Sequence, residues 1–376
     1  MAWGWRRLAA LVVFASSLSP ALAQPPTAHW PDYEIILWHR QPHTAYAGLP
    51  RLGYSGALVN GRRAGIDEDA ARADSAPLIA AGLRWYVENI ATDFYSNYHR
   101  WEGPDRPVNW RYLELQRRYR ENPRDPALFL REPSLSDPDW IARIRARLAA
   151  HARVHAAIAA PGRPFFLNLA DEPGIADLSA FWDFDFSPHS LAGFRAWLRG
   201  EYPSLAALNA QWGTAFADWD AVLPETTDAA LARTDGNLSA WSDFREWMDI
   251  AFARAVRAGR DAVSAEGSGL LAAIAGGQRA GWGGWNYGVL APQVDVLEGG
   301  ELALASAFHP GLVTVSTSFA ADAREWHRLW RQVLHGARGT IIWDGSRDVV
   351  TADGEAGPRG LASLPVFMTL RGGIPA

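Results

Sequence analysis

The sequence predicts an α/β fold in which eight parallel strands alternate with helices and close into a (β/α)8, or TIM, barrel. Eight short runs rich in β-branched, aromatic and aliphatic residues lead to this prediction, and segments long enough for a helix separate most of them. This alternation is typical of a parallel sheet built from βα units. With 376 residues, 48% of them hydrophobic, the chain is long enough for one large barrel domain.

The segments that connect the predicted strands differ in length. Roughly seventy residues separate the third strand from the fourth, and roughly a hundred separate the fourth from the fifth, far more than an ordinary βα loop. We therefore expect long loops after strands 3 and 4, on the face of the barrel that carries active sites. The eight predicted strands are Tyr33–Trp38, Gly56–Val59, Leu83–Ile90, Phe165–Ala170, Leu270–Ala275, Val294–Leu297, Leu312–Thr317 and Gly339–Trp343.

The connecting segments contain clear helix patterns. Ser136–Asp139 is a capping sequence with a proline in the first turn, and the apolar residues Trp140, Ile144 and Leu148 then recur every four residues. Similar spacing predicts helices around Phe194–Tyr202 and Phe244–Ala255.

The first 23 residues are typical of a cleaved secretory leader. Arg6 and Arg7 precede a short apolar run, and Ala21-Leu22-Ala23 has the small-residue pattern of a cleavage site. The run is too short for a membrane anchor, which needs about 18 apolar residues. We expect residues 1–23 to be a signal peptide, residues 24–376 to form the barrel catalytic domain, and the mature protein to be secreted or periplasmic, with no membrane partner.

Composition excludes several kinds of chemistry. The 36 basic residues are all Arg, so neither a Schiff-base lysine nor a phosphate-loop lysine is available. The net charge of −5 and the scattered Arg argue against nucleic acid as a partner. Without Cys the chain has no thiolate or Cys-ligated metal, and its ten His do not follow a metal-binding spacing. We therefore expect no metal and no cofactor.

The end of the fourth predicted strand carries two adjacent carboxyl groups, Asp171 and Glu172. Strand alternation places Asn168, Ala170 and Glu172 on one face, with Glu172 at the barrel mouth and Asn168 below it. A carboxyl there could act as a general acid, because the neighbouring Asp171 would raise its pKa. A loop carboxylate or a helix cap is the alternative interpretation of Glu172.

Two later stretches carry an ordered set of motifs. Phe194–Glu225 contains a Phe-Arg-x-Trp-Leu helix, a Tyr, a Leu-x-x-Leu-Asn turn and a Trp-Gly-Thr-x-Phe stretch. Leu329–Gly339, followed by Ile341–Trp343, has a helix-His-Gly-Ala-x-Gly entry into the eighth strand. Both stretches resemble glycoside hydrolase family 42, the β-galactosidases, and the likeness extends faintly over Asp32–Gly373.

The resemblance implies a (β/α)8 barrel, sugar substrates and a retaining mechanism with two carboxylates, in which Glu172 is the acid/base. Three departures limit it. Asp171 stands where the family usually has Asn, the chain has no Cys for the family's metal loop, and the seventh strand, Val313–Phe319, has no carboxylate where the family nucleophile is expected.

A second carboxylate is therefore expected from the preceding strand. Glu298 follows Val294 and Val296 on one face, and Glu301 lies just beyond a Gly pair. A separation of about 5–5.5 Å from Glu172 would fit a retaining reaction and about 6.5–9.5 Å an inverting one. The alternative is that these glutamates cap the loop or bind a surface Arg.

Further residues are candidates for sugar binding at the mouth. Trp343 closes strand 8, and aromatic rings stack on the apolar faces of sugars. For each sugar-binding candidate, core packing or loop hydrogen bonding is the alternative interpretation. The sequence thus predicts a glycoside hydrolase that acts on an oligosaccharide, a polysaccharide or another glycoside. The alternative is an inactive barrel that binds carbohydrate. The sequence does not indicate an oligomeric state. The substrate-binding candidates are Asn168, Asp171, Trp343, Trp285, Tyr95, Asn97 and His39.

Overall fold

The computed structural model describes most of the chain after the predicted leader. Residues 1–23, the predicted signal peptide, lie outside the described part. The described residues are 30–61, 66–96, 104–107, 110–158, 164–175, 183–266, 269–281 and 283–373.

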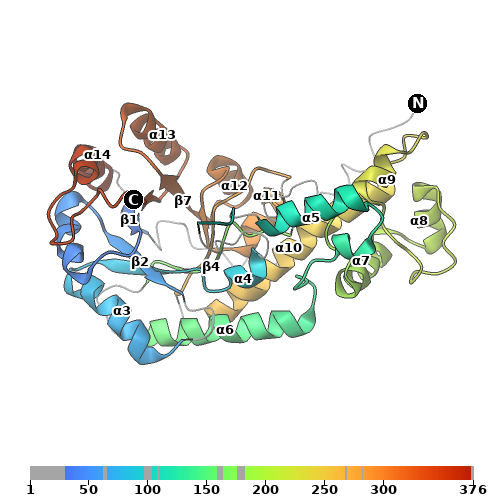
Figure 1. Cartoon of the computed structure of the whole chain (residues 1–376), viewed down its shortest axis with the longest axis horizontal. Helices are drawn as coiled ribbons and strands as arrows, with labels where there is room; N and C mark the ends of the chain where they lie inside the picture. The colour runs from blue at the N-terminus through green and yellow to red at the C-terminus, as the bar shows by residue number, and fades with distance from the viewer. Residues whose placement is uncertain are drawn as a thin grey trace.

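Eight parallel strands form a closed barrel in which each strand pairs with the next and β8 pairs with β1 (Figure 1). The predicted (β/α)8 barrel is therefore confirmed, and each strand lies within a few residues of its predicted position. The strands are β1 Glu34–Trp38, β2 Gly56–Asn60, β3 Arg84–Glu88, β4 Leu167–Asp171, β5 Ala272–Ala275, β6 Val296–Glu298, β7 Val313–Ser318 and β8 Gly339–Trp343.

Helices connect the strands and cover the outside of the barrel. Among the described residues, none of these helices is long and apolar enough to cross a bilayer. The α-helices are α3 Glu68–Ala80, α4 Thr92–Tyr95, α5 Trp110–Glu121, α6 Pro138–Ala157, α7 Pro188–Glu201, α8 Leu205–Trp212, α9 Thr227–Leu231, α10 Ser239–Glu266, α11 Tyr287–Leu290, α12 Leu302–Phe308, α13 Ala323–Leu334 and α14 Pro358–Gly373.

The predicted helices form for the reasons that the sequence suggests. In α6, Pro138 occupies the first turn, the Asp137 side chain accepts a hydrogen bond from the Asp139 N–H, and Ile144 and Leu148 are buried. The segments after β3 and β4 are long, and both contain several helices. In Figure 1, α7, α8 and α9 lie at the end of the molecule away from the barrel, and α10 runs from there back to it.

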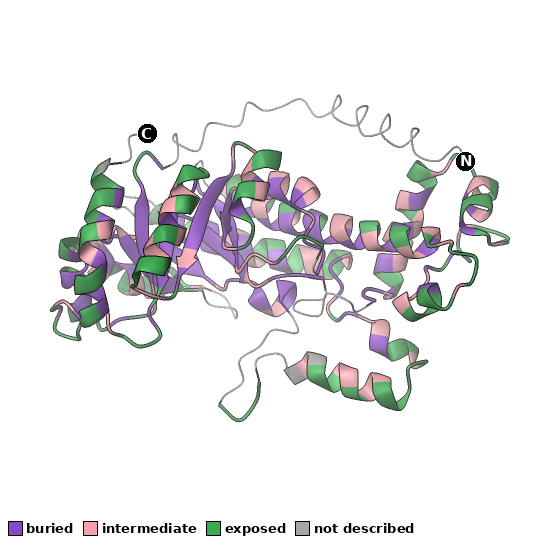
Figure 2. Cartoon of the chain, turned by 90° about the horizontal axis from the view of Figure 1, so that it is seen from above, coloured by how far each residue is buried: buried purple, intermediate pink, exposed green. Residues whose placement is uncertain are grey.

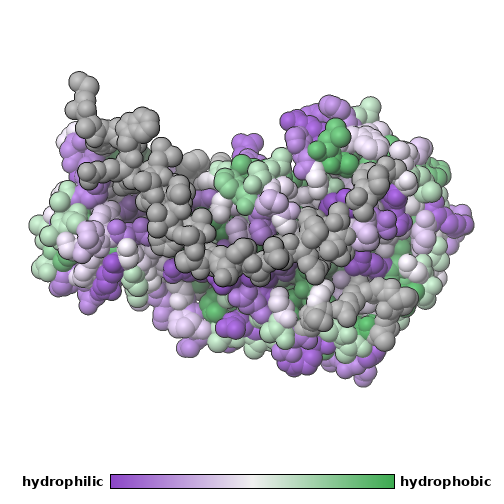
Figure 3. Space-filling view, turned by 180° about the vertical axis from the view of Figure 1, so that it is seen from behind, coloured by the Kyte–Doolittle hydropathy of each residue, from purple (hydrophilic) through white to green (hydrophobic). Residues whose placement is uncertain are grey.

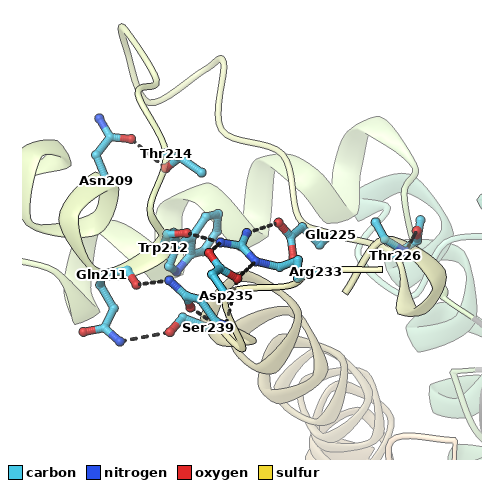
Figure 4. A network of polar contacts seen from close by, with 11 residues as sticks. Asn209, Gln211, Trp212, Thr214, Glu225, Thr226, Arg233, Asp235 and Ser239 are labelled. Atoms are coloured by element: carbon cyan, nitrogen blue, oxygen red, sulfur yellow. Dashed lines mark hydrogen bonds and ion pairs between the residues drawn. The ribbon is translucent and has the colours of Figure 1, made fainter. Parts of the chain in front are cut away.

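The motif residues of the segment after β4 hold its turns together (Figure 4). The Asn209 side chain accepts hydrogen bonds from the Thr214 hydroxyl and the Phe216 N–H, both at 2.9 Å, and so closes the turn after α8. Nearby, Arg233 donates to Glu225 at 2.6 Å. The Leu-x-x-Leu-Asn and Trp-Gly-Thr-x-Phe motifs are therefore structural elements of this helical segment.

Two apolar layers define the inside and the outside of the barrel wall. One cluster fills the barrel and includes Ile36, Phe166, Val296 and Val315. A larger cluster lies between the strands and the surrounding helices, whose inward faces are buried in Figure 2. Membership of the two clusters therefore shows towards which face the buried apolar residues of each strand point.

Hydrophilic and hydrophobic side chains are mixed on the face of the molecule that Figure 3 shows. In Figure 3, hydrophilic side chains on one face are interspersed with small hydrophobic areas. This arrangement agrees with the net charge of −5 and with the scattered distribution of the Arg residues.

Candidate active site

The end of β4 departs from simple strand alternation. Asn168 pairs with Ala273, which lies inside the barrel, but the register then shifts and Ala170 packs outward against the helices. This bulge turns Asp171 inward, where its charge acts on the other carboxyl groups of the mouth. The prediction that Asn168, Ala170 and Glu172 share one face was therefore wrong, because one extra residue reverses the alternation.

Glu172 leaves the strand at the barrel mouth in a left-handed conformation. Its φ is +46°, its N–H donates to the Ala275 carbonyl at 3.0 Å, and its side chain is half-buried. Positive φ is uncommon for a residue with a side chain and is found at functional sites. The charge of Glu172 acts on Glu298, so these two predicted carboxyl groups lie in one cluster.

Glu298 is the most buried of the predicted catalytic residues, with 7% of its surface exposed. The Thr317 hydroxyl donates to its Oε1 at 2.5 Å. Burial is the main influence that raises the pKa of Glu298, to about 8; the Thr317 hydrogen bond opposes this shift, and the charges of Asp171, Glu88 and Glu172 add to it. Burial therefore favours the protonated form of Glu298 in the free protein.

The sequence reasoning missed Glu88, a carboxyl at the end of β3. It is 3% exposed, and the hydroxyl of Tyr86 donates to its Oε2 at 2.6 Å. Burial, followed by the charge of Asp171, raises the pKa of Glu88 to about 7, against hydrogen bonds from Tyr86 and Trp38. The available signal was a Glu two residues after Tyr86 at the end of a predicted strand, which places both on one face.

Glu301 is not brought into this cluster. It is exposed at the start of α12, where its N–H donates to the Tyr287 hydroxyl at 3.2 Å. The strand before it begins at Val296, which faces the barrel interior together with Glu298, whereas Val294 packs in the outer cluster. The prediction that Val294 shares the face of Glu298 was therefore wrong.

Two predicted sugar-binding aromatics lie in the core. Tyr95 is fully buried and donates to the Ala255 carbonyl at 2.7 Å, while Trp285 is fully buried and donates to the Pro173 carbonyl at 2.7 Å. Their assignment to sugar binding was wrong, because large aromatics after a strand fill the space between barrel and helices. Asn97 lies outside the described residues.

Other aromatic side chains lie at the mouth. Trp343 is 41% exposed and stacks on Trp38 with ring centroids 5.8 Å apart, and Phe319 lies 5.9 Å from Trp343. His39 is half-buried with its ring edge-on to Trp38, and burial and then the charge of Arg347 lower its pKa. The structure thus places Trp343 and His39 at the ends of β8 and β1, and their contact with sugar stays a prediction.

Asn168 lies inside the barrel below the carboxyl groups. It is fully buried, and its Oδ1 accepts from the Ala170 N–H at 3.2 Å. Its Nδ2 has no hydrogen-bond partner among the residues that the structure describes. Across all the residues that the structure describes, no group of three or more His, Asp or Glu side chains has a metal-binding arrangement.

A family model supports the resemblance found in the sequence. Residues 168–266 match the model of glycoside hydrolase family 42, described as beta-galactosidase. Over this segment the chain is similar to family 42. The matched segment begins in β4, includes Asp171 and Glu172, and ends with the last residue of α10. A glycosidase is the enzyme class that this match supports.

Solved structures share the fold of this chain. The catalytic domain of beta-amylase from Paenibacillus polymyxa superimposes with a TM-score of 0.66 at 13% identity, covering 91% of this chain and 99% of that one. Beta-galactosidases from Marinomonas ef1 and Rahnella sp. R3 give TM-scores of 0.61 and 0.60 at 14% and 13% identity, covering 90% and 93% of this chain.

This chain spans only 59% and 58% of those two beta-galactosidases. At these identities the likeness shows the barrel fold alone. No curated protein matches the sequence.

Proposed function

We propose that this chain hydrolyses glycosides, with Glu172 as the proton donor and Glu298 as the nucleophile or base. The observation that carries the proposal is the carboxyl cluster at the mouth, in which the charge of Glu172 acts on a buried Glu298. The family match over residues 168–266 supports the same chemistry. Most glycoside hydrolases use two carboxyl groups that flank the bond to be cleaved.

The proposed reaction uses one proton from Glu172. That proton goes to the glycosidic oxygen, which leaves with the electron pair of the broken C–O bond. Ionised Glu298 then either bonds to the sugar carbon, giving an ester that water hydrolyses, or takes a proton from a water molecule that attacks this carbon. In both routes the net reaction adds one water molecule across the glycosidic bond.

Aromatic rings at the rim fit a sugar substrate. The ring of Trp343, which is 41% exposed and stacks on Trp38, offers an apolar surface, and Trp38 in turn contacts Glu88 of the acidic cluster. Such a ring packs against the C–H face of a sugar while carboxylates accept hydrogen bonds from its hydroxyl groups. β-Galactosides are the first substrates to test, because the matching family model carries that description.

The test compares wild type with Glu172→Gln on aryl glycosides of increasing leaving-group basicity. Glutamine keeps the size of the side chain but cannot give up a proton, so the rate should fall by roughly 100-fold or more. The loss should be largest for the most basic leaving group, which needs protonation most. Glu301→Gln, at an exposed position, is the matched control and should keep wild-type rates.

The absence of a carboxylate from β7 favours a second candidate function, a carbohydrate-binding barrel without activity. Wild-type protein that binds sugars but hydrolyses no aryl glycoside would support this candidate and reject the hydrolase.

A further inference from the structure

The end of β7 occupies the place where the resemblance to family 42 predicts the nucleophile. Thr317 fills this place, and its neighbour in the sheet, Ile341, lies inside the barrel. The Thr317 side chain therefore enters the mouth from β7. On α13, Arg328 donates to the Thr317 carbonyl, which anchors this end of the strand.

Glu298 comes from the adjacent strand and extends towards this place. It pairs with Val315, two residues before Thr317, yet its carboxyl accepts the Thr317 hydroxyl hydrogen at 2.5 Å. The next residue, Gly299, has φ of +73° and donates its N–H to the Val315 carbonyl at 2.8 Å. The chain after Glu298 is thus held against β7, and the carboxyl lies at the end of that strand.

We propose that Glu298 supplies from β6 the carboxyl group that the family places on β7, and that Thr317 is the positioning residue that holds it there. This inference rests on the proposed function. A donated hydrogen bond from Thr317 fixes one carboxyl oxygen and favours the ionised form of Glu298. Without it, Glu298 would be held less firmly and would face Asp171, Glu172 and Glu88 with one stabilising contact fewer.

The first test replaces Thr317 with Val, which keeps the shape of the side chain but removes the hydroxyl group. The ratio kcat/KM should fall about ten- to a hundredfold, mainly through kcat, and its rise with pH should move to higher pH. Thr317→Ser, which restores a hydroxyl, should recover most of the loss. Unchanged kcat/KM and an unchanged pH profile in Thr317→Val would overturn the proposal.

Thr314→Val is the matched control on the same strand. Thr314 is fully buried, pairs with the outward-facing Leu297, and its hydroxyl has no hydrogen-bond partner among the described residues. The same chemical change there should leave the kinetics and the pH profile as they are. An equal kinetic loss in Thr314→Val would mean that the effect belongs to the strand and not to the contact with Glu298.

A second test moves the carboxyl back to β7. Glu298→Thr alone should lose at least a hundredfold in kcat, and adding Thr317→Glu to it should recover at least tenfold. A double variant no more active than Glu298→Thr would contradict the inference that one place in the mouth can be reached from either strand. Thermal melting of each variant identifies any that fail to fold.

Failure of the proposed function can be told apart from failure of this inference. If wild type hydrolyses no glycoside, the proposed function fails, and titration of Glu298 by carbon NMR of labelled protein still tests Thr317. The signal is assigned from its loss in Glu298→Gln. A titration of Glu298 that moves to higher pH in Thr317→Val supports the positioning role, and an unmoved titration rejects it.

Discussion

The protonation of Glu298 decides how the proposed reaction depends on pH. Burial is the main influence that raises its pKa to about 8, which favours the protonated form at neutral pH. A nucleophile or base must be ionised, so for an aryl glycoside whose leaving group departs without protonation, kcat/KM is expected to rise as the pH rises through about 8. The measurement is kcat/KM for an aryl glycoside over a range of pH that brackets this value. A profile that falls through the same range would instead make Glu298 the proton donor.

Glu88 should lower the stability of the protein in alkaline solution. Its pKa in the folded chain is about 7, against an ordinary value of 4.5. The stability contributed by its protonated form is therefore fully present below pH 4.5 and is lost as the pH rises through 7. Because Gln cannot ionise, Glu88→Gln should be more stable than wild type by roughly 3 kcal/mol above that range, and close to wild type in acid.

Urea unfolding at acid and alkaline pH tests this expectation, with Glu201→Gln at an exposed position at the end of α7 as the control. The same variant has a kinetic readout. Removing the charge of Glu88 removes one influence that raises the pKa of Glu298, so the rise of kcat/KM should move to lower pH. Equal pH dependence of stability in Glu88→Gln and wild type would contradict a buried, ionising Glu88.

At the scale of single elements, the turn after β5 supports the end of β4. Gly276 has φ of +65°, and a Cβ placed there would lie 2.5 Å from Glu172 Cγ and 3.1 Å from Asp171 Oδ1. A side chain at this position would therefore displace both carboxyl groups. This glycine is required by close contact as well as by its backbone conformation.

Gly276→Ala is expected to lose at least tenfold in kcat/KM and about 2 kcal/mol in the free energy of unfolding. Gly82→Ala is the matched control, because Gly82 has φ of +72° but a Cβ added to it would have nothing within 4 Å. The control shares the backbone strain and should lose only about 1 kcal/mol, with kinetics unchanged. Similar kinetics in the two variants would show that Gly276 does not position the carboxyl groups.

The elements differ in how far the sequence could predict them. The eight strands were predictable because each is a short apolar run between helical segments. The bulge in β4 was not, because a shift between Asn168 and Ala170 depends on how β4 pairs with β5. Glu88 was missed for a related reason: both faces of a barrel strand are buried, so alternation alone does not say which face is inside.

The same ambiguity explains the aromatic candidates. An aromatic residue at or after the end of a strand can lie at the mouth, as Trp343 does, or face the helical layer, as Tyr95 and Trp285 do. Sequence position separates these cases only when the path of the following loop is known. Glu172 and Glu298, by contrast, lie at the ends of β4 and β6, where the sequence places them, and their catalytic roles stay predictions.

At the scale of the whole molecule, Arg131 joins the two long segments that flank the candidate site. Its guanidinium group is fully buried and donates to the Phe94 carbonyl at 3.0 Å, in the segment after β3. It also donates to Gly174 at 3.2 Å and Ile175 at 2.8 Å, in the segment after β4. The position of the chain just after Glu172 therefore depends on a residue that is more than forty positions away in the sequence.

Replacing Arg131 with Lys should affect both stability and the proposed activity. Lysine keeps the positive charge, but its compact ammonium group cannot reach carbonyl oxygens in both segments at once. Buried carbonyl groups are then left unpaired, at a cost of roughly 3 kcal/mol in the free energy of unfolding. Because the segment after Glu172 loses its anchor, kcat should fall by a larger factor than the affinity for sugar.

Arg324→Lys, at an exposed position on α13, is the control for the chemical change itself and should behave as wild type. Chemical unfolding and steady-state kinetics on the two variants separate the effects. An Arg131→Lys variant with wild-type kcat but reduced stability would show that Arg131 only holds the fold together. A lower kcat in Arg131→Lys, measured well below the melting temperature of the variant, would show that Arg131 positions Glu172 by holding the two long segments together.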